Sequence, residues 1–135
     1  MTSFDLQIVT PDGRCFDGEA QRLTIPTIQG QVGILARHIN YVTALGMGTA
    51  KVLTQNGERC AACIGGMVAV TDGSVKVVAT TFEWADEIDV ARAEASMARG
   101  EKMLAAPDCD EQTKQYANAR IKRAKIRLNV AKKNK

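Results

Sequence analysis

The sequence predicts an α+β protein, with an N-terminal antiparallel β-sandwich followed by a C-terminal antiparallel two-helix hairpin. Up to residue 85, short segments of alternating polarity are separated by turn residues, a pattern typical of an antiparallel sandwich or barrel. Beyond residue 85, apolar residues recur three and four positions apart, which is typical of helices. We therefore expect a sandwich domain over 1-85 and a helical hairpin domain over 86-135.

The strands of the sandwich are delimited by turn signals. Alternating apolar residues over 4–8 predict a first strand, which Pro11-Asp12-Gly13 ends, and Asp17-Gly18 is interpreted as a second turn. Asn56-Gly57 and Asp72-Gly73 supply the positive φ angles of tight hairpins. The strands flanking these two turns are expected at 49–54, 59–64, 67–70 and 75–79.

The first helix is expected over 90–105, with Asp89 as its N-cap. Gly100 falls inside this helix and is expected to soften it, since glycine costs about 1 kcal/mol relative to alanine. Trp84, the only tryptophan, precedes the hairpin and is expected to report hairpin docking by fluorescence. The apolar seam of this helix comprises Val90, Ala93, Met97, Gly100 and Leu104.

The second helix follows the break at Pro107-Asp108-Cys109-Asp110, where either aspartate can act as its N-cap. Both helices have narrow seams rich in small residues, so each buries little apolar surface. We therefore expect an antiparallel hairpin that docks weakly and exchanges between conformations. The seam of the second helix comprises Ala117, Ile121, Ala124, Leu128 and Ala131.

Charge is distributed unevenly along the chain. The net charge of +3 combines six Lys/Arg and seven Asp/Glu up to Ala85 with twelve Lys/Arg and eight Asp/Glu from Asp86 onward. From Lys114 to the end there are nine basic residues and no acidic one. Such a segment indicates either an acidic or phosphate-bearing partner or a solvated helix face.

The residues argue against an enzyme or a metal protein. A P-loop and a catalytic triad motif are both missing, and the single histidine, His38, leaves Cys60 and Cys63 without a second ligand pair. All four cysteines are expected to be reduced thiols. Asp86, Glu87 and Asp89 precede a helix, where acids favour the macrodipole, so a catalytic carboxylate cluster is the weaker interpretation. Neither a signal peptide nor a membrane span is expected.

The order of short motifs resembles one known family along nearly the whole chain. These motifs are IVTPDG at 8–13, GQVGIL at 30–35 followed by His38, Gly65-Gly66, IDVARA at 88–93, and the basic stretch over 122–131. Together they are similar to the epsilon subunit of bacterial F-type ATP synthases. The chain departs from that pattern at Arg37, where the family commonly has glycine or another small residue, at Asn40, where a proline is frequent, and at Gly100.

The resemblance implies a rotor subunit of the central stalk, without catalytic activity, on the cytoplasmic face of the bacterial plasma membrane. Its sandwich would contact the gamma subunit and the c-subunit ring, and membrane association would occur only through the complex. Gln29, Gly30 and Gln31 match the ring-facing loop, whereas His38 and Tyr41 fall in the gamma-facing region. A hydrogen-bonded loop histidine is the alternative interpretation of His38.

For the hairpin, the resemblance implies a brake on ATP hydrolysis. The inhibitory basic face would comprise Arg120, Lys122, Arg123 and Lys125, attracted to acidic surfaces of the catalytic head formed by the beta and alpha subunits. No cofactor is required, but ATP is implied as a regulatory ligand. The residues that match the family's ATP site are Glu83, Ile88, Asp89, Arg92, Ala93, Arg99, Arg123 and Arg127. Solvated arginines at the seam edges are the alternative interpretation.

A nucleic-acid-binding module is the alternative function from another class. The basic final helix has the charge to follow a phosphate backbone. Only Tyr116 offers a stacking surface in that segment, however, and the sandwich motifs would have no explanation. We therefore expect no nucleic-acid partner.

Overall fold

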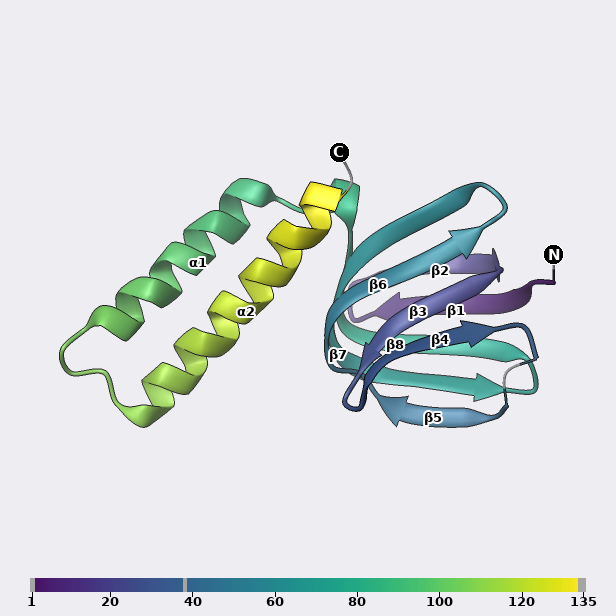
Figure 1. Cartoon of the computed structure of the whole chain (residues 1–135), viewed down its shortest axis with the longest axis horizontal. Helices are drawn as coiled ribbons and strands as arrows, with labels where there is room; N and C mark the ends of the chain where they lie inside the picture. The colour runs from purple at the N-terminus through teal and green to yellow at the C-terminus, as the bar shows by residue number, and fades with distance from the viewer. Residues whose placement is uncertain (1, 38, 134–135) are drawn as a thin grey trace. The chain divides into compact units, whose positions relative to one another are not determined.

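The computed structural model describes residues 2–37 and 39–133, and His38 therefore lies outside the described residues. The chain divides into two compact units, Met1–Trp84 and Ala85–Lys135. Figure 1 shows that strands form the first unit and helices the second. The predicted α+β class, a β-sandwich followed by a two-helix hairpin, is confirmed.

The strands of the first unit are β1 (Phe4–Thr10), β2 (Gly13–Ala20), β3 (Arg22–Thr27), β4 (Gly30–Leu35), β5 (Tyr41–Ala44), β6 (Met47–Thr54), β7 (Gly57–Thr71) and β8 (Ser74–Trp84). Their hydrogen-bonded order is β2-β1-β8-β7-β6-β3-β4, and β5 pairs with β7. The β1–β8 pair is parallel, whereas the other pairs are antiparallel. The first half of β7 pairs with β6 and the second half with β5, so β7 contributes to both layers.

The strand β7 changes layer at Gly65-Gly66. Both glycines have positive φ, 70° at Gly65 and 120° at Gly66, a region in which residues with a Cβ are strained. A Cβ on Gly66 would overlap the carbonyl oxygen of Val78 and lie 2.7 Å from the Cα of Ala79 on β8. The sequence-based division into strands at 59–64 and 67–70 was therefore wrong, because the two glycines bend one continuous strand.

A second correction concerns Asp17-Gly18, which lies inside β2 and does not form a turn. Asp17 pairs with Gln7 and Gly18 with Leu6 on β1. This pairing over the length of β1 outweighs the turn preference of an Asp-Gly dipeptide, because local propensity yields to cross-strand hydrogen bonding.

The sandwich core forms where the inward-facing positions of the two layers meet. Leu6 and Ile8, predicted as one face of the first strand, are fully buried, as is Ile34 on β4. Trp84 belongs to the same core. Its indole Nε1–H donates to the backbone carbonyl of Cys15 at 3.1 Å, and the guanidinium carbon of Arg59 lies 3.9 Å from its ring centroid. Because residues of the sandwich surround the indole, we expect its fluorescence to report the folding of the sandwich.

The backbone conformation of Arg37 bears on one of the departures from the family pattern. It has a φ of 65°, a left-handed conformation that glycine adopts without strain and arginine does not. Glycine is therefore the residue that the backbone favours at this position, and the arginine is a local source of strain.

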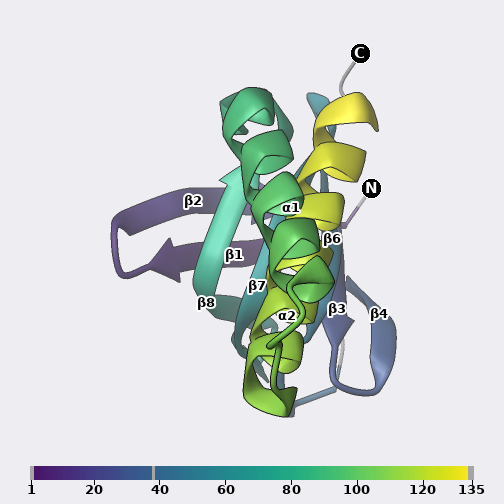
Figure 2. The same ribbon diagram turned by 90° about the vertical axis from the view of Figure 1, so that its left-hand side faces the viewer.

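The second unit contains a short 3-10 helix, η1 (Ala85–Glu87), and the helices α1 (Val90–Ala105) and α2 (Glu111–Lys133). The predicted N-cap of α1 is confirmed, since the Asp89 carboxylate accepts the backbone N–H of Arg92 at 3.1 Å. Asp110 caps α2 by accepting the backbone N–H of Thr113 at 2.8 Å, and hydrogen bonding to Thr113 lowers the pKa of Asp110. Figures 1 and 2 show the two helices side by side and antiparallel.

Candidate functional site

The helical hairpin is held together by very small residues at its centre. Ala117 and Ala124 of α2 are fully buried, and Ala93 of α1 is nearly so. Gly100 is buried against α2: a Cβ there would lie 2.7 Å from Cγ1 of Ile121 and 3.2 Å from the Ala117 carbonyl oxygen. Gly100 therefore allows the close contact, rather than simply softening the helix as its propensity suggests. One predicted seam residue was wrong, because Val90 is 39% exposed.

A hydrogen-bonded arginine links the two helices beside this seam. Arg120 of α2 donates from Nε to the hydroxyl of Ser96 on α1 at 2.9 Å. It also donates from Nη1 to the hydroxyl oxygen of Tyr116, one turn earlier on its own helix, at 3.2 Å. The bond to Ser96 shows which sides of the two helices lie together.

The arginines of both helices gather on that same side of the hairpin. Arg92, Ser96 and Arg99 are four and three residues apart, so they share one side of α1. Arg120, Arg123 and Arg127 share one side of α2 by the same spacing. Since Ser96 contacts Arg120, the two sides adjoin. We call Arg92, Arg99, Arg120, Arg123 and Arg127 the arginine flank.

The arginine flank is strongly positive and compact. A rise of about 1.5 Å per residue puts Arg92 and Arg99 roughly 10 Å apart along α1, and Arg123 and Arg127 roughly 6 Å apart along α2. Both acidic residues of α1, Glu94 and Glu101, lie two positions beyond Arg92 and Arg99 and therefore on the other side of the helix. Guanidinium groups at this spacing suit the oxygens of a phosphate chain.

The residues that match the family's ATP site are divided between the two units of the chain. The arginine flank contains four of them, Arg92, Arg99, Arg123 and Arg127. Asp89 is the N-cap of α1, three residues before Arg92. Ile88, half-buried, precedes the cap. Ala93 is buried in the helix seam, so its methyl group packs against α2 instead of facing solvent. Glu83 lies on β8 and belongs to the sandwich unit.

The four residues expected to form one basic face are divided between two. Arg120 and Arg123 are half-buried and belong to the arginine flank, whereas Lys122 and Lys125 are exposed. At 100° per residue, Lys122 lies on the solvent side of α2, and Lys125 lies on the edge of α2 opposite the arginine flank. The sequence run made them look contiguous, but helical geometry separates them.

On the sandwich, the loop expected to face a ring lies at the turn between β3 and β4. Gln29, Gly30 and Gln31 are all exposed, and Thr27 fixes the turn by donating from Oγ1 to the Gly30 carbonyl at 2.7 Å. Sequence reasoning missed Ile28, which is 68% exposed at the same turn. Tyr41 is half-buried and packs against the sandwich core.

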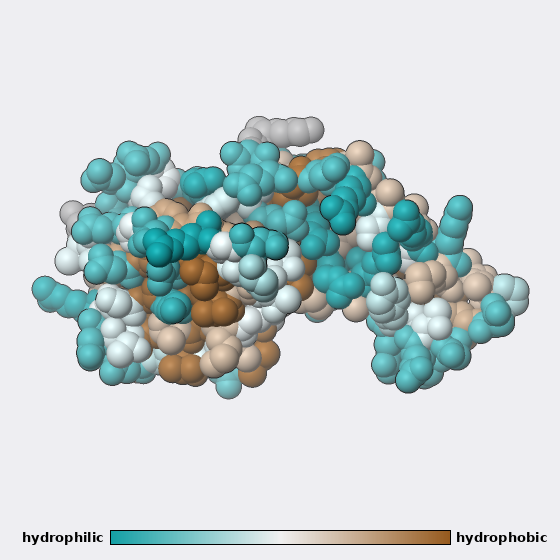
Figure 3. Space-filling view, turned by 180° about the vertical axis from the view of Figure 1, so that it is seen from behind, coloured by the Kyte–Doolittle hydropathy of each residue, from teal (hydrophilic) through white to brown (hydrophobic). Residues whose placement is uncertain are grey.

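Sequence reasoning also missed an apolar patch on one sheet face. Val42 of β5, Met67 of β7 and Val78 of β8 are 61%, 53% and 47% exposed. Met67 pairs with Val78, and Val42 pairs with Ala69 two residues further along β7, so the three side chains lie on adjacent strands. Figure 3 shows apolar side chains gathered on the sandwich surface. We call Val42, Met67 and Val78 the apolar patch. The sequence signal for it was the presence of apolar residues at strand positions that face outward.

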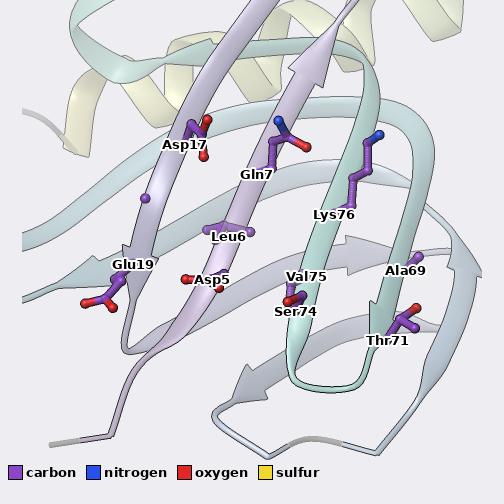
Figure 4. A pocket seen from close by; sticks show the side chains of 11 residues that line it. Asp5, Leu6, Gln7, Asp17, Glu19, Ala69, Thr71, Ser74, Val75 and Lys76 are labelled. Atoms are coloured by element: carbon purple, nitrogen blue, oxygen red, sulfur yellow. The ribbon is translucent and has the colours of Figure 1, made fainter.

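A hollow of about 590 Å³ lies on the same sheet, over β2, β1, β8 and β7. Asp5, Asp17 and Glu19 line it together with Lys76, and Figure 4 shows these side chains arrayed across neighbouring strands. Asp17 is also bonded to Arg14 at 3.0 Å. Three carboxylates against one ammonium repel a phosphate-bearing ligand, so this hollow is not a candidate nucleotide site.

The cysteines give no sign of a redox or metal site. All four are free thiols, and burial raises the pKa of Cys63 to about 12, so this thiol stays protonated at neutral pH. Within the part of the chain that the structure describes, no cluster of three His, Cys, Asp or Glu residues could hold a metal ion. The same residues include no helix long and apolar enough to cross a membrane.

Comparison with known families gives a match for both units. The family model for the ATP synthase delta/epsilon chain β-sandwich domain matches residues 3–85, and the model for its long α-helix domain matches residues 86–132. The fold therefore defines a two-domain subunit of the ATP synthase delta/epsilon class. The chain belongs to the family of F-type ATP synthase epsilon chains.

Individual relatives agree with this assignment. The ATP synthase epsilon chain of Ruminococcus albus is 40% identical over 134 residues, covering 98% of this chain and 99% of its own. That of Shouchella clausii is 33% identical over 132 residues, covering 98% and 97%. Among solved structures, the chain resembles one in the Euglena gracilis mitochondrial ATP synthase (OSCP/F1/c-ring, rotational state 1), with a TM-score of 0.81, 22% identity and coverage of 97% and 82%. This last likeness concerns the fold alone.

Proposed function

We propose that the protein is a non-catalytic rotor subunit of the central stalk, which couples proton translocation to ATP synthesis and inhibits ATP hydrolysis. It would act at the cytoplasmic face of the bacterial plasma membrane, bound there only through the complex. The observation that carries the stalk role is the apolar patch, because contiguous exposed apolar side chains on a folded sheet indicate an interface with another protein. The family match covers both the sandwich and the basic helices, so the basic charge of α2 needs no nucleic-acid partner to explain it.

The apolar patch is the proposed gamma-subunit contact, and the β3–β4 turn is the proposed contact with the c-subunit ring. The patch offers rigid strand positions, since Met67 and Val78 are paired in the middle of β7 and β8. The turn offers Ile28 with the amides of Gln29 and Gln31, so it has apolar and hydrogen-bonding groups but no charge. His38, expected in the gamma-facing region, lies outside the described residues.

Replacement of Met67 and Val78 together by glutamate should prevent assembly with the gamma subunit. A buried unpaired carboxylate costs roughly 3–5 kcal/mol, so affinity should fall at least about a hundred-fold. Both side chains are already exposed in the isolated chain, so its folding should not change. Binding is measured by co-purification with gamma and by calorimetry. The control adds two glutamates at the interstrand positions Gln21 and Gln55; equal binding by both variants would rule out the patch as the contact.

The arginine flank is the proposed ATP sensor. Four of its guanidiniums belong to the residues that resemble the family's ATP site. Helical spacing puts these four beside one another when α1 packs against α2, the arrangement that we call the closed hairpin. A triphosphate bound across α1 and α2 would stabilise the closed hairpin, because a ligand favours the state that binds it. Bound ATP would thus oppose any state in which the helices separate.

Arg92→Ala should weaken ATP binding by more than ten-fold, the scale of a lost charge-assisted hydrogen bond of roughly 1.5–3 kcal/mol. Arg92 is exposed in the first turn of α1, and its backbone N–H, not its side chain, completes the Asp89 cap. The helix should therefore persist, and circular dichroism checks this. Calorimetry on the isolated chain measures the affinity. Absence of ATP binding by the unaltered protein at millimolar nucleotide would exclude the sensor.

A further inference from the structure

Arg120 is held differently from its neighbours on the arginine flank. Two neutral hydroxyls, those of Ser96 and Tyr116, accept its hydrogen bonds at 2.9 and 3.2 Å. A carboxylate in either place would cancel its charge, whereas a hydroxyl orients the guanidinium and leaves its positive charge in place. The bonds to Ser96 and Tyr116 use Nε and Nη1 and so engage two of the five N–H donors of the guanidinium, which leaves N–H groups that can bind an anion.

The position of Arg120 is central to the flank. It lies three residues before Arg123 on the same side of α2, and its partner Ser96 lies between Arg92 and Arg99 on α1. An anion that contacts Arg99 on one helix and Arg123 on the other must therefore pass beside Arg120. Arg120 is half-buried, which lowers the local dielectric and strengthens its interaction with charge.

We propose that Arg120, oriented by Ser96 and Tyr116, is a phosphate-binding residue of the arginine flank. This inference rests on the proposed ATP sensing and adds a fifth arginine to it. The inference also removes Arg120 from the inhibitory basic face. While the hairpin is closed, its guanidinium binds the phosphate ligand and Ser96 of the other helix. Ser96 and Tyr116 are positioning residues, since they act on the ligand through Arg120.

The decisive variant is Arg120→Gln, which removes the charge but keeps a side-chain amide that can bond to Ser96 or Tyr116. We expect ATP affinity of the full chain, measured by calorimetry, to fall about ten-fold, as for a lost charge-assisted contact. The dependence of affinity on ionic strength should also become shallower, because one fewer charge attracts the triphosphate. A purely structural role for Arg120 would leave this salt dependence unchanged.

Two further variants complete the test. Ser96→Ala with Tyr116→Phe keeps the charge of Arg120 but releases its orientation, so affinity should fall by roughly three-fold with the salt dependence preserved. Lys114→Ala removes an exposed cation from α2, three turns before Lys125 and on the same side of the helix, away from the arginine flank, and should bind ATP like the unaltered protein. Thermal unfolding of the hairpin, followed by circular dichroism, identifies any variant that has lost its fold.

The outcomes separate the two proposals. If the unaltered protein binds ATP and Arg120→Gln matches Lys114→Ala in affinity and salt dependence, the role of Arg120 is overturned and ATP sensing stands. If Arg120→Gln binds more weakly with an unchanged salt dependence, Arg120 supports the hairpin only, and the phosphate contact is again overturned. If the unaltered protein does not bind ATP, both proposals fail together.

Discussion

Gly66→Ala is expected to destabilise the sandwich by at least about 3 kcal/mol, through a strained backbone and a backbone overlap at one position. Gly66 has a φ of 120°, and a Cβ there would overlap the Val78 carbonyl oxygen on β8. The obstructing atoms belong to a paired strand, so no side-chain rotation relieves the overlap. For a domain of this size the unfolding midpoint should fall by more than about 10 °C, measured by the fluorescence of Trp84.

Two glycines of the same sandwich serve as controls for Gly66. Gly57 also has a positive φ, 119°, but a Cβ there meets nothing within 4 Å, so Gly57→Ala should cost only the backbone strain of about 1–2 kcal/mol. Gly33 has open space without a positive φ, so Gly33→Ala should be nearly neutral. A loss of stability at Gly66 no larger than that at Gly57 would show that the β7–β8 contact does not constrain this position.

Local chemistry allowed much of the fold to be predicted from the sequence. The turns at Asn56-Gly57 and Asp72-Gly73 and the cap at Asp89 each depend on neighbouring residues alone. The errors occurred where distant residues decide the outcome. Asp17-Gly18 is held in a strand by β1, and Gly65-Gly66 is a bend within β7 rather than an interruption, because β8 continues the pairing across it.

In the candidate site, too, the features set by neighbouring residues were predictable and those set by distant residues were not. The spacing of Arg92 and Arg99 along one helix, and of Arg123 and Arg127 along the other, was enough to predict that each pair shares a side. The helix register was not predictable, because it depends on the fit of Ile121 against Gly100. The bond from Arg120 to Ser96 follows from that register, and so was invisible in the sequence. The apolar patch was missed because each of its residues, taken singly, is an ordinary strand residue.

Removal of the hairpin is expected to release ATP hydrolysis while leaving assembly and ATP synthesis intact. The sandwich core is built entirely from residues of the first unit, Phe4 to Trp84, so a chain ending at Asp86 should fold by itself. The apolar patch and the β3–β4 turn both remain in that chain. If the hairpin is the brake, hydrolysis by the assembled enzyme should rise roughly five-fold or more, the lower range of typical regulatory coupling.

The divided basic residues show how that brake would act. Lys122 and Lys125 are exposed in the closed hairpin and can attract carboxylates directly, whereas Arg120 and Arg123 are half-buried and belong to the arginine flank, the proposed phosphate site of the closed hairpin. Replacing Lys122 and Lys125 by alanine should therefore release part of the inhibition, and added salt should weaken what remains. Alanine favours helix, so melting of α2 does not explain such a result. Hydrolysis that is the same with and without the hairpin, in membranes carrying equal amounts of enzyme, would exclude a braking role in this synthase.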